Sequence, residues 1–306
     1  MKKIRNRITA LVTGMAIMCL SCNTIKTYAT EGEEKEPKEH VILFVSDIHE
    51  TVEENLKPFL TRYKETADET EYICFGGDYA KKYDKKVLND VVSCNNSLLP
   101  QTKAVYTVGN HDLSGFEEKS FNDITKQASR GRKIKEEGYV IYTFGASTDK
   151  QSFREDDIKQ LETFLETTKT IIPRVPVFII SHYPLHYCEK GKRIRVTEGV
   201  EQLITLLDQY SNVIFLYGHN HSMSDQNYEI IYMPGDEIEI AKNEYRTINF
   251  CYTSMGAMKD GAGMQVYALK VSIKNTTCCN QVSLEHLNFD SEPKDKMMVC
   301  FPLVEK

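Results

Sequence analysis

The chain has 306 residues, of which 41% are hydrophobic and 27% are charged, and this is the ordinary composition of a globular protein. Its formal net charge of −6 argues against a general nucleic-acid binder, because phosphate backbones attract basic surfaces. A small anionic substrate is compatible with that charge, since a pair of bound dications can dominate the field at a site. We therefore expect a small-molecule partner and no nucleic-acid polymer.

Residues 1–29 are predicted to be a signal peptide. The basic stretch 1–7 precedes an apolar run, residues 8–20, that is too short to span a bilayer comfortably. We expect cleavage after Ala29 and hence a secreted or extracytoplasmic protein. A lipid anchor at Cys22 on the cell surface and an uncleaved membrane anchor are the two alternatives.

The rest of the chain divides into a tether and one domain. Residues 30–39 are acidic and are predicted to form a solvated tether. Residues 40–306 are long enough for one large α/β domain with a substantial core.

Cysteine usage does not settle the redox compartment. The chain has nine cysteines, and seven of them follow Ala29, so they cannot all pair within one chain. None of these seven belongs to a Cys-x-x-Cys motif. We expect Cys74 to be a small buried hydrophobe, and Cys278 and Cys279 to lie in a loop or at a strand edge.

The first part of the domain predicts alternating strands and helices. Residues 41–46 are a continuous apolar run, typical of a strand buried on both faces. Residues 52–66 predict a helix that Pro58 either kinks or delays. A strand at 72–75, a helix at 85–98 and a strand at 104–108 follow. This order implies parallel strands joined by right-handed crossovers.

The alternation continues along the chain before its character changes. The next predicted elements are a strand at 139–144, a helix at 154–168, a strand at 175–180, a helix at 197–210 and a strand at 213–217. Three later segments, at 248–253, 264–273 and 281–289, are predicted to be antiparallel strands.

Five polar motifs each follow a predicted strand. They are Asp47-Ile48-His49, Gly76-Gly77-Asp78, Gly109-Asn110-His111-Asp112, Ser181-His182 and Gly218-His219-Asn220-His221. Taken singly, each motif is explained as well by a turn or a helix cap. Loops at the carboxyl ends of strands converge on one crevice, however, and these carboxylate, imidazole and amide groups suit divalent metals. The five motifs together therefore predict a metal site.

The five motifs, in this order, resemble those of the metallophosphoesterase superfamily, also called calcineurin-like phosphoesterases. The resemblance covers residue 41 to about residue 222 and implies an α/β fold, a four-layer α/β/β/α sandwich with two mixed β-sheets. It also implies two divalent ions, and Mn²⁺, Fe or Zn²⁺ would suit the ligands. It assigns the bridging position to Asp78. The remaining ligands it implies are Asp47, His49 and His221 for one ion, and Asn110, His182 and His219 for the other.

The same resemblance implies a hydrolase that acts on a small phosphorylated substrate. A hydroxide held between the two ions would attack the phosphoester, and His111 would aid the leaving group. Asp112 is expected to hold the His111 imidazole in its protonated form. One alternative is a nucleotide or cyclic-nucleotide phosphodiesterase. The other is a catalytically silent surface binding protein with the same fold.

At several positions this chain differs from particular branches of the superfamily, and these differences argue against membership of those branches. Many members have Asp where Lys81 stands, and purple acid phosphatases have Tyr there and Gly in place of His49. The Asp-Arg-Gly of protein Ser/Thr phosphatases is missing near the second motif. We therefore expect the chain to belong to neither of those branches.

Two further regions could shape the site. Residues 190–195, with Lys192, Arg193 and Arg195, are expected either to lie at the rim of the site or to form a solvated loop. His186 is a candidate for the pocket and not a ligand.

Overall fold

The computed structural model describes residues 38–66, 69–146, 152–168, 175–187, 198–220, 231–258, 266–276, 278–288 and 297–302. The predicted signal peptide, most of the tether, His221 and the basic stretch 190–195 lie outside these residues. From Glu39 onward the chain forms one compact unit. Among the described residues, no helix is long and apolar enough to cross a membrane.

The larger sheet has seven strands and is mixed, as expected. β1 (Glu39–Val45), β2 (Thr70–Phe75) and β3 (Lys103–Tyr106) are parallel neighbours, which confirms that these strands are parallel, as predicted. On the other side of β1, the antiparallel strands are β12 (Tyr267–Asn275), β13 (Cys279–Leu287) and β14 (Met297–Pro302). A short strand, β11 (Gly256–Ala257), also pairs with β12.

The smaller sheet has five strands, in the order β10-β7-β6-β5-β4. Its members are β4 (Lys133–Glu136), β5 (Tyr139–Gly145), β6 (Val177–Ser181), β7 (Val213–Tyr217) and β10 (Cys251–Ser254). The prediction of antiparallel strands is wrong for β10, which pairs in parallel with β7. A parallel pair needs a long connection, and the chain between these strands supplies one. This connection contains the hairpin of β8 (Glu237–Ala241) and β9 (Glu244–Thr247).

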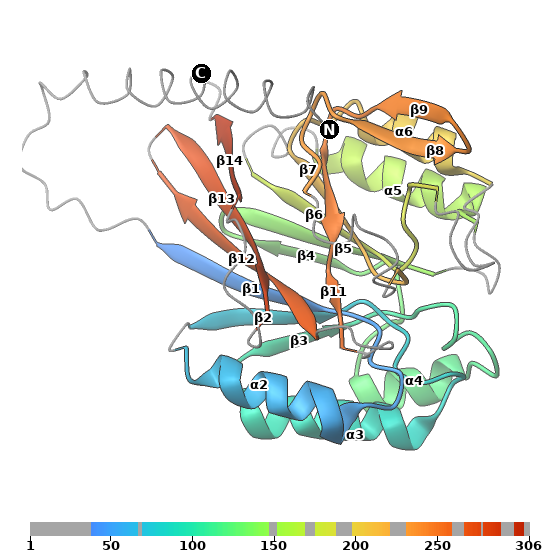
Figure 1. Cartoon of the computed structure of the whole chain (residues 1–306), viewed down its shortest axis with the longest axis vertical. Helices are drawn as coiled ribbons and strands as arrows, with labels where there is room; N and C mark the ends of the chain where they lie inside the picture. Colours follow the sequence, from blue (N-terminus) through green and yellow to red (C-terminus); the bar gives the residue numbers. More distant parts are fainter. Residues whose placement is uncertain are drawn as a thin grey trace, which may run out of the picture. The chain divides into compact units, whose positions relative to one another are not determined.

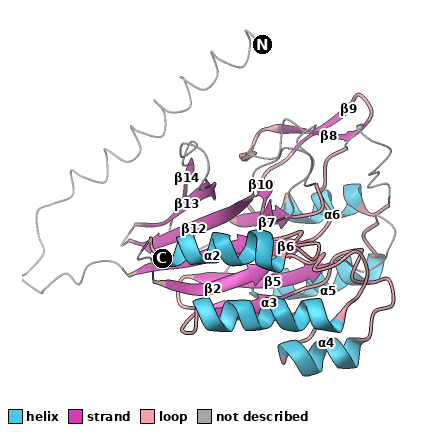
Figure 2. Ribbon diagram, turned by 60° about the horizontal axis from the view of Figure 1, so that its bottom comes forward, coloured by secondary structure: helices cyan, strands magenta, loops and turns pink. Residues whose placement is uncertain are grey.

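Helices cover the outer face of each sheet (Figures 1 and 2). The larger sheet packs against a turn of π-helix, η2 (Val52–Leu56), and the helices α2 (Lys57–Lys64), α3 (Lys85–Leu98) and α4 (Glu118–Thr125). The smaller sheet packs against α5 (Glu155–Thr168) and α6 (Val200–Leu207). Pro58 lies in the first turn of α2. The predicted helix begins at Val52 as a π-helical turn, and its α-helical part begins only at Lys57, next to this proline.

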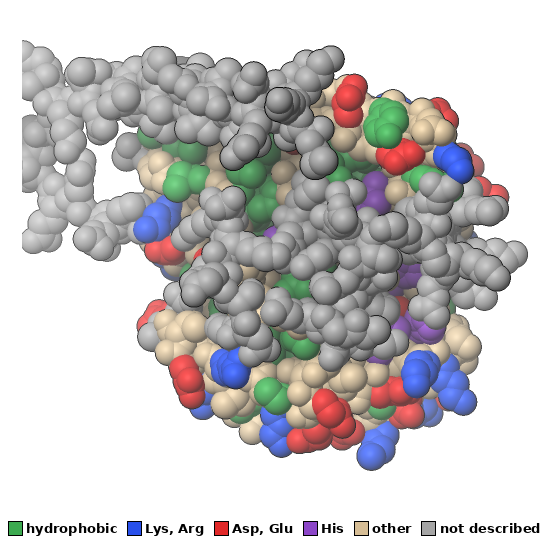
Figure 3. Space-filling model, in the orientation of Figure 1, with side chains coloured by type: hydrophobic (Ala, Val, Ile, Leu, Met, Phe, Trp, Pro, Cys, Tyr) green, Lys and Arg blue, Asp and Glu red, His purple; other side chains and the backbone are tan. Residues whose placement is uncertain are grey.

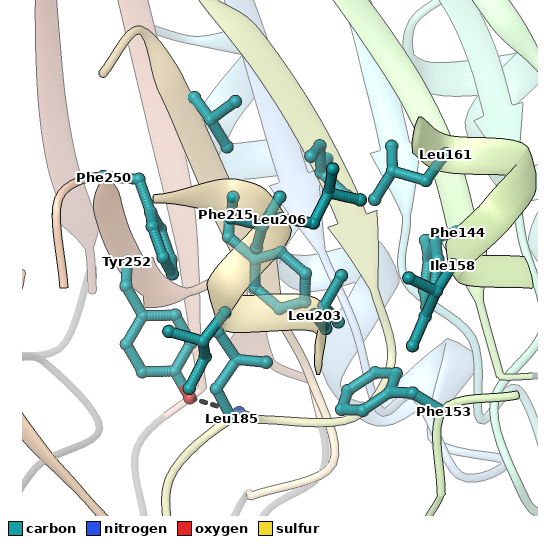
Figure 4. Close-up of a cluster of buried hydrophobic side chains, with 14 of the residues drawn as sticks. Phe144, Phe153, Ile158, Leu161, Leu185, Leu203, Leu206, Phe215, Phe250 and Tyr252 are labelled. Atoms are coloured by element: carbon teal, nitrogen blue, oxygen red, sulfur yellow. Dashed lines mark hydrogen bonds between the residues drawn. The ribbon is translucent and has the colours of Figure 1, made fainter. Parts of the chain in front are cut away.

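The side chains of β1 show why the sheets form two inner layers. Leu43 and Val45 pack in the apolar cluster under α2 and α3, whereas Ile42 and Phe44 pack in a second cluster between the sheets. Phe44 meets Phe178 of β6 there, with ring centroids 5.8 Å apart. A third cluster, drawn in part in Figure 4, lies beneath α5 and α6. Three apolar clusters separate four layers, so the α/β/β/α sandwich is confirmed.

The cysteine predictions are confirmed where the structure describes them. Cys74 is fully buried in the cluster between the sheets. Cys278 is exposed just before β13, and Cys279 is the first residue of that strand.

Candidate metal centre

The first loop of the site begins where β1 ends. Asp47 and His49 have positive backbone φ angles of 54° and 46°, and Asp78 (56°) and His219 (69°) share this property. Residues other than glycine rarely take that conformation, and strain of this kind clusters at functional sites. The loop is held in place by backbone hydrogen bonds from Asp47 N to Gly77 O and from His49 N to Asp78 O, each 3.0 Å long.

Asp78 lies at the middle of the site. Its side chain is almost fully buried, and its Oδ2 atom is 3.2 Å from His182 Nε2 and 3.6 Å from His49 Nε2. The Nε2 atom of His111 lies 4.0 Å from the same oxygen. Asp78 therefore belongs to two clusters that could each hold a cation, one with His49 and His111 and one with His182 and His219. A carboxylate shared by two such clusters is suited to bridging two ions.

Charge at this point is balanced between the carboxylate and the imidazoles. Burial acts to raise the pKa of Asp78, but the adjacent His182 and His49 outweigh it and hold that pKa below its usual value. Burial acts to lower the pKa of His182, but Asp78 and Asp47 outweigh it and raise that pKa to about 9. Without a cation, Asp78 and His182 thus form an ion pair. A cation bound to His182 would displace its proton, because imidazole coordinates metals in its neutral form.

His182 is oriented by a backbone group. Its Nδ1 donates to the carbonyl oxygen of Gly76 at 2.9 Å, which leaves Nε2 directed toward Asp78 and Asn110. The Asn110 Oδ1 atom is 3.1 Å from that nitrogen. A histidine that donates one ring N–H to a carbonyl presents the other nitrogen as a metal ligand.

Glycine lets the loops approach one another. A Cβ atom at Gly109 would lie 2.2 Å from Asp78 Oδ1 and 2.7 Å from His182 Cε1. A Cβ atom at Gly218 would lie 2.8 Å from Asp47 Oδ2. Any other residue at these two positions would therefore displace candidate ligands. In the space-filling view, histidine side chains reach the surface along the right-hand side of the molecule (Figure 3).

A family model described as calcineurin-like phosphoesterase matches residues 40–223, which is more than half of the chain. The chain belongs to the calcineurin-like phosphoesterase family. No curated protein sequence matches it.

Solved structures of this fold are similar to the chain at low sequence identity. A purple acid phosphatase, PPD1 from yellow lupin (Lupinus luteus), matches with a TM-score of 0.58 and 10% identity, over 87% of this chain and 54% of that one. A 5'-nucleotidase precursor from Thermus thermophilus matches with a TM-score of 0.43 and 10% identity, over 87% and 55%. The chain thus spans about half the length of the lupin protein, and at 10% identity that likeness shows the fold alone.

For a calcineurin-like phosphoesterase, the donor set fits divalent cations. The structure brings together Asp47, His49, Asp78, Asn110, His111, His182 and His219. Carboxylate oxygen, imidazole nitrogen and amide oxygen are suitable ligands for Mn²⁺, Fe²⁺ and Zn²⁺. The family and this donor set together indicate a metal-binding protein.

The expected role of Asp112 is corrected by its contacts. Its buried carboxylate accepts three backbone N–H groups, from Asp78 at 2.7 Å, Tyr79 at 3.0 Å and Gly109 at 2.8 Å. It therefore fixes the Asp78 and Gly109 loops. The His111 imidazole donates instead from Nδ1 to the carbonyl oxygen of Lys81, 3.0 Å away.

Sequence reasoning missed the carbonyl groups of Gly76 and Lys81. Both orient a histidine through a backbone atom, and a backbone atom carries no residue signature. No pattern in the sequence could have identified them.

Proposed function

We propose that this chain hydrolyses phosphoesters with the help of two divalent cations. Asp78 would bridge them, and the other ligands would be Asp47, His49, Asn110, His182, His219 and His221. The observation that carries the proposal is the group of three imidazoles, from His49, His111 and His182, within 4.0 Å of one buried carboxylate oxygen. Cations bound there would neutralise the phosphoryl oxygens and lower the pKa of an attacking water.

His111 is proposed to serve the leaving group. Its Nδ1 is engaged with the Lys81 carbonyl, so Nε2 is the ring nitrogen that would serve the leaving group. That atom lies 4.0 Å from the Asp78 carboxylate, and the side chain is 37% exposed, which gives a substrate access to it. A positioned imidazole of this kind can deliver a proton to a departing alkoxide.

The test is turnover by metal-free protein reloaded with Mn²⁺, Fe²⁺ or Zn²⁺. We expect hydrolysis of a generic aryl phosphate only after metal is added. Faster hydrolysis of a bis-aryl phosphodiester would instead favour the phosphodiesterase alternative. Bound metal without turnover of either ester would contradict the proposal and favour the silent binding protein.

The Asp78→Asn variant tests the bridging role. We expect loss of both metals and of activity, because an amide supplies one neutral oxygen where a carboxylate supplies two charged ones. Elemental analysis of the purified variant measures this directly. Asp157→Asn is the matched control, since Asp157 pairs with Arg130 away from the site. Two metals per chain in Asp78→Asn would contradict the assignment.

We also propose that the chain is exported. The support is the basic stretch and short apolar run at the start of the sequence. Mass spectrometry of protein from its native host is expected to show an N-terminus near Thr30 or a lipidated Cys22. An intact Met1 on soluble cytoplasmic protein would contradict export.

A further inference from the structure

Behind the candidate metal centre lies a set of buried polar side chains, the His186 network, which consists of His186, Asn220 and Tyr252. His186 follows β6, Asn220 follows β7 and Tyr252 belongs to β10. His186 and Asn220 are each 5% exposed, and Tyr252 is fully buried. None of the three is among the candidate metal ligands.

Hydrogen bonds join the three side chains in series. Tyr252 Oη accepts the backbone N–H of Leu185 at 2.8 Å, the contact drawn as a dashed line in Figure 4. It also lies 2.6 Å from His186 Nδ1. The other ring nitrogen of His186, Nε2, lies 3.0 Å from the side-chain amide of Asn220. Both ring nitrogens are therefore engaged, each with a different loop or strand.

The network is anchored in the rigid part of the fold. The Tyr252 ring stacks on Tyr217 of β7, with centroids 4.7 Å apart. Its backbone exchanges two hydrogen bonds with Tyr232, at 2.9 Å and 3.0 Å. Buried polar networks whose members are hydrogen-bonded make a region rigid and specify one arrangement.

Each end of the network lies close in sequence to a candidate ligand. Leu185 and His186 are three and four residues after His182, and Asn220 directly follows His219. The two loops also meet through a hydrogen bond from Gly218 N to His182 O, at 3.1 Å. Both loops are thus tied to Tyr252, one through backbone N–H groups and the other through His186.

We propose that the His186 network positions His182 and His219 for metal binding. The inference rests on the proposed function, in that those two histidines are taken as ligands. Residues that orient metal ligands through hydrogen bonds typically change metal affinity about 10–100-fold when they are replaced. The three residues are positioning residues, since none of them is a proposed ligand of the cation.

Two replacements of His186 separate its two contacts. An Asn side chain carries an amide near the position of Nδ1, whereas the longer Gln side chain reaches the position of Nε2. His186→Asn therefore loses the contact with Asn220, and His186→Gln keeps it. Tyr252→Phe removes the hydroxyl that holds the Leu185 loop. Tyr63→Phe is the matched control, because it removes a buried hydroxyl bonded to Thr70 Oγ1 at 2.7 Å, in the helical layer of the other sheet.

Metal affinity, measured by calorimetric titration with Mn²⁺ and Zn²⁺, is expected to fall about 10–100-fold in His186→Asn and Tyr252→Phe. We expect Tyr63→Phe to bind metal as the wild type does. His186→Gln is expected to lose less affinity than His186→Asn, because it keeps the contact with Asn220 and loses only the one with Tyr252. Wild-type affinity in folded His186→Asn and Tyr252→Phe would overturn the proposal.

Amide hydrogen exchange in metal-free protein gives a second readout, which separates this inference from the proposed function. We expect faster exchange at Leu185 in Tyr252→Phe, and at His219 and Asn220 in His186→Asn but not in His186→Gln. If the wild type binds no metal, the proposed function fails, and exchange alone decides whether the network fixes these loops. Unchanged exchange in both variants would overturn the positioning role.

Discussion

Asp78 and Asp112 are both buried carboxylates, each 1% exposed, yet their surroundings give them different tasks. Asp78 faces three imidazoles, whereas Asp112 faces three backbone N–H groups. Burial and the nearby charge of Asp78 raise the pKa of Asp112 to about 7, against the lowering effect of the N–H groups of Gly109 and Asp78. The first carboxylate is placed to bind cations, and the second holds two ligand loops together.

The Asp112→Asn variant tests this division. The Asn amide has one acceptor oxygen, and its NH₂ group would face a backbone N–H that the carboxylate accepted. At least one buried hydrogen bond is therefore lost. We expect the metal-free variant to lose about 1.5–3 kcal/mol of unfolding free energy, measured by urea denaturation. Asp84→Asn is the comparison, since Asp84 accepts N–H groups at the exposed start of α3. Undiminished stability with a large loss of rate would return Asp112 to the role of supporting His111.

The His111→Ala variant is expected to keep its metal and lose rate. The imidazole lies at the partly exposed side of the site, so its removal leaves the other donors in place. General acid catalysis typically contributes about 10²–10⁴-fold to a rate. We expect that loss in kcat for alkyl esters and a smaller one for aryl esters, whose leaving groups need less protonation. Equal losses for both kinds of ester would argue that His111 only binds the phosphoryl group.

At the scale of the elements, the sequence predicts long, strongly patterned segments well. The bounds expected for the helix at 85–98 and the strand at 213–217 are those of α3 and β7. The short strand β4 was missed because only Ile134 of its four residues is buried, so no alternation is visible. Helix α4 was missed because it has eight residues and buries only Phe121 and Thr125.

The candidate site was predictable where its residues directly follow the carboxyl ends of strands. Asp78 and His182 could be placed together because parallel strands bring their carboxyl ends to one edge. The direction of the Asp112 carboxylate depends on where two other loops present their N–H groups. The contact between Tyr252 and Leu185 depends on the parallel pairing of β10, which was predicted wrongly.

Gly77 offers a test of how closely the loops pack. A Cβ atom there would lie 2.1 Å from Gly109 N, whereas a Cβ atom at Gly235 would meet nothing within 4 Å. Their φ angles, 95° and 98°, are nearly the same, so Ala carries a similar backbone cost at both sites, about 1–2 kcal/mol. We expect Gly77→Ala to lose clearly more unfolding free energy than Gly235→Ala, and to bind metal more weakly. Equal losses in urea denaturation would show that the loops can separate without cost.

At the scale of the whole molecule, the candidate centre draws on both sheets. Asp47, Asp78 and Asn110 follow strands of the larger sheet, and His182 and His219 follow strands of the smaller one. The sheets also meet through apolar side chains, such as Phe44 and Phe178, and through polar contacts, such as the hydrogen bond from Tyr139 Oη to Glu71 Oε2 at 2.8 Å. A cation held by ligands from both sheets would therefore add a further link between them.

Metal binding is accordingly expected to stabilise the domain as a whole. A ligand that binds only the folded state at 100 times its Kd adds about 2.7 kcal/mol to the unfolding free energy. We expect added Mn²⁺ or Zn²⁺ to raise the thermal midpoint of the wild type, and a chelator to reverse the rise. Asp78→Asn is the control and is expected to show neither change, since it lacks the carboxylate shared by the two clusters. A wild-type midpoint that stays constant while elemental analysis finds bound metal would contradict the link, because such a cation would bind folded and unfolded chains alike.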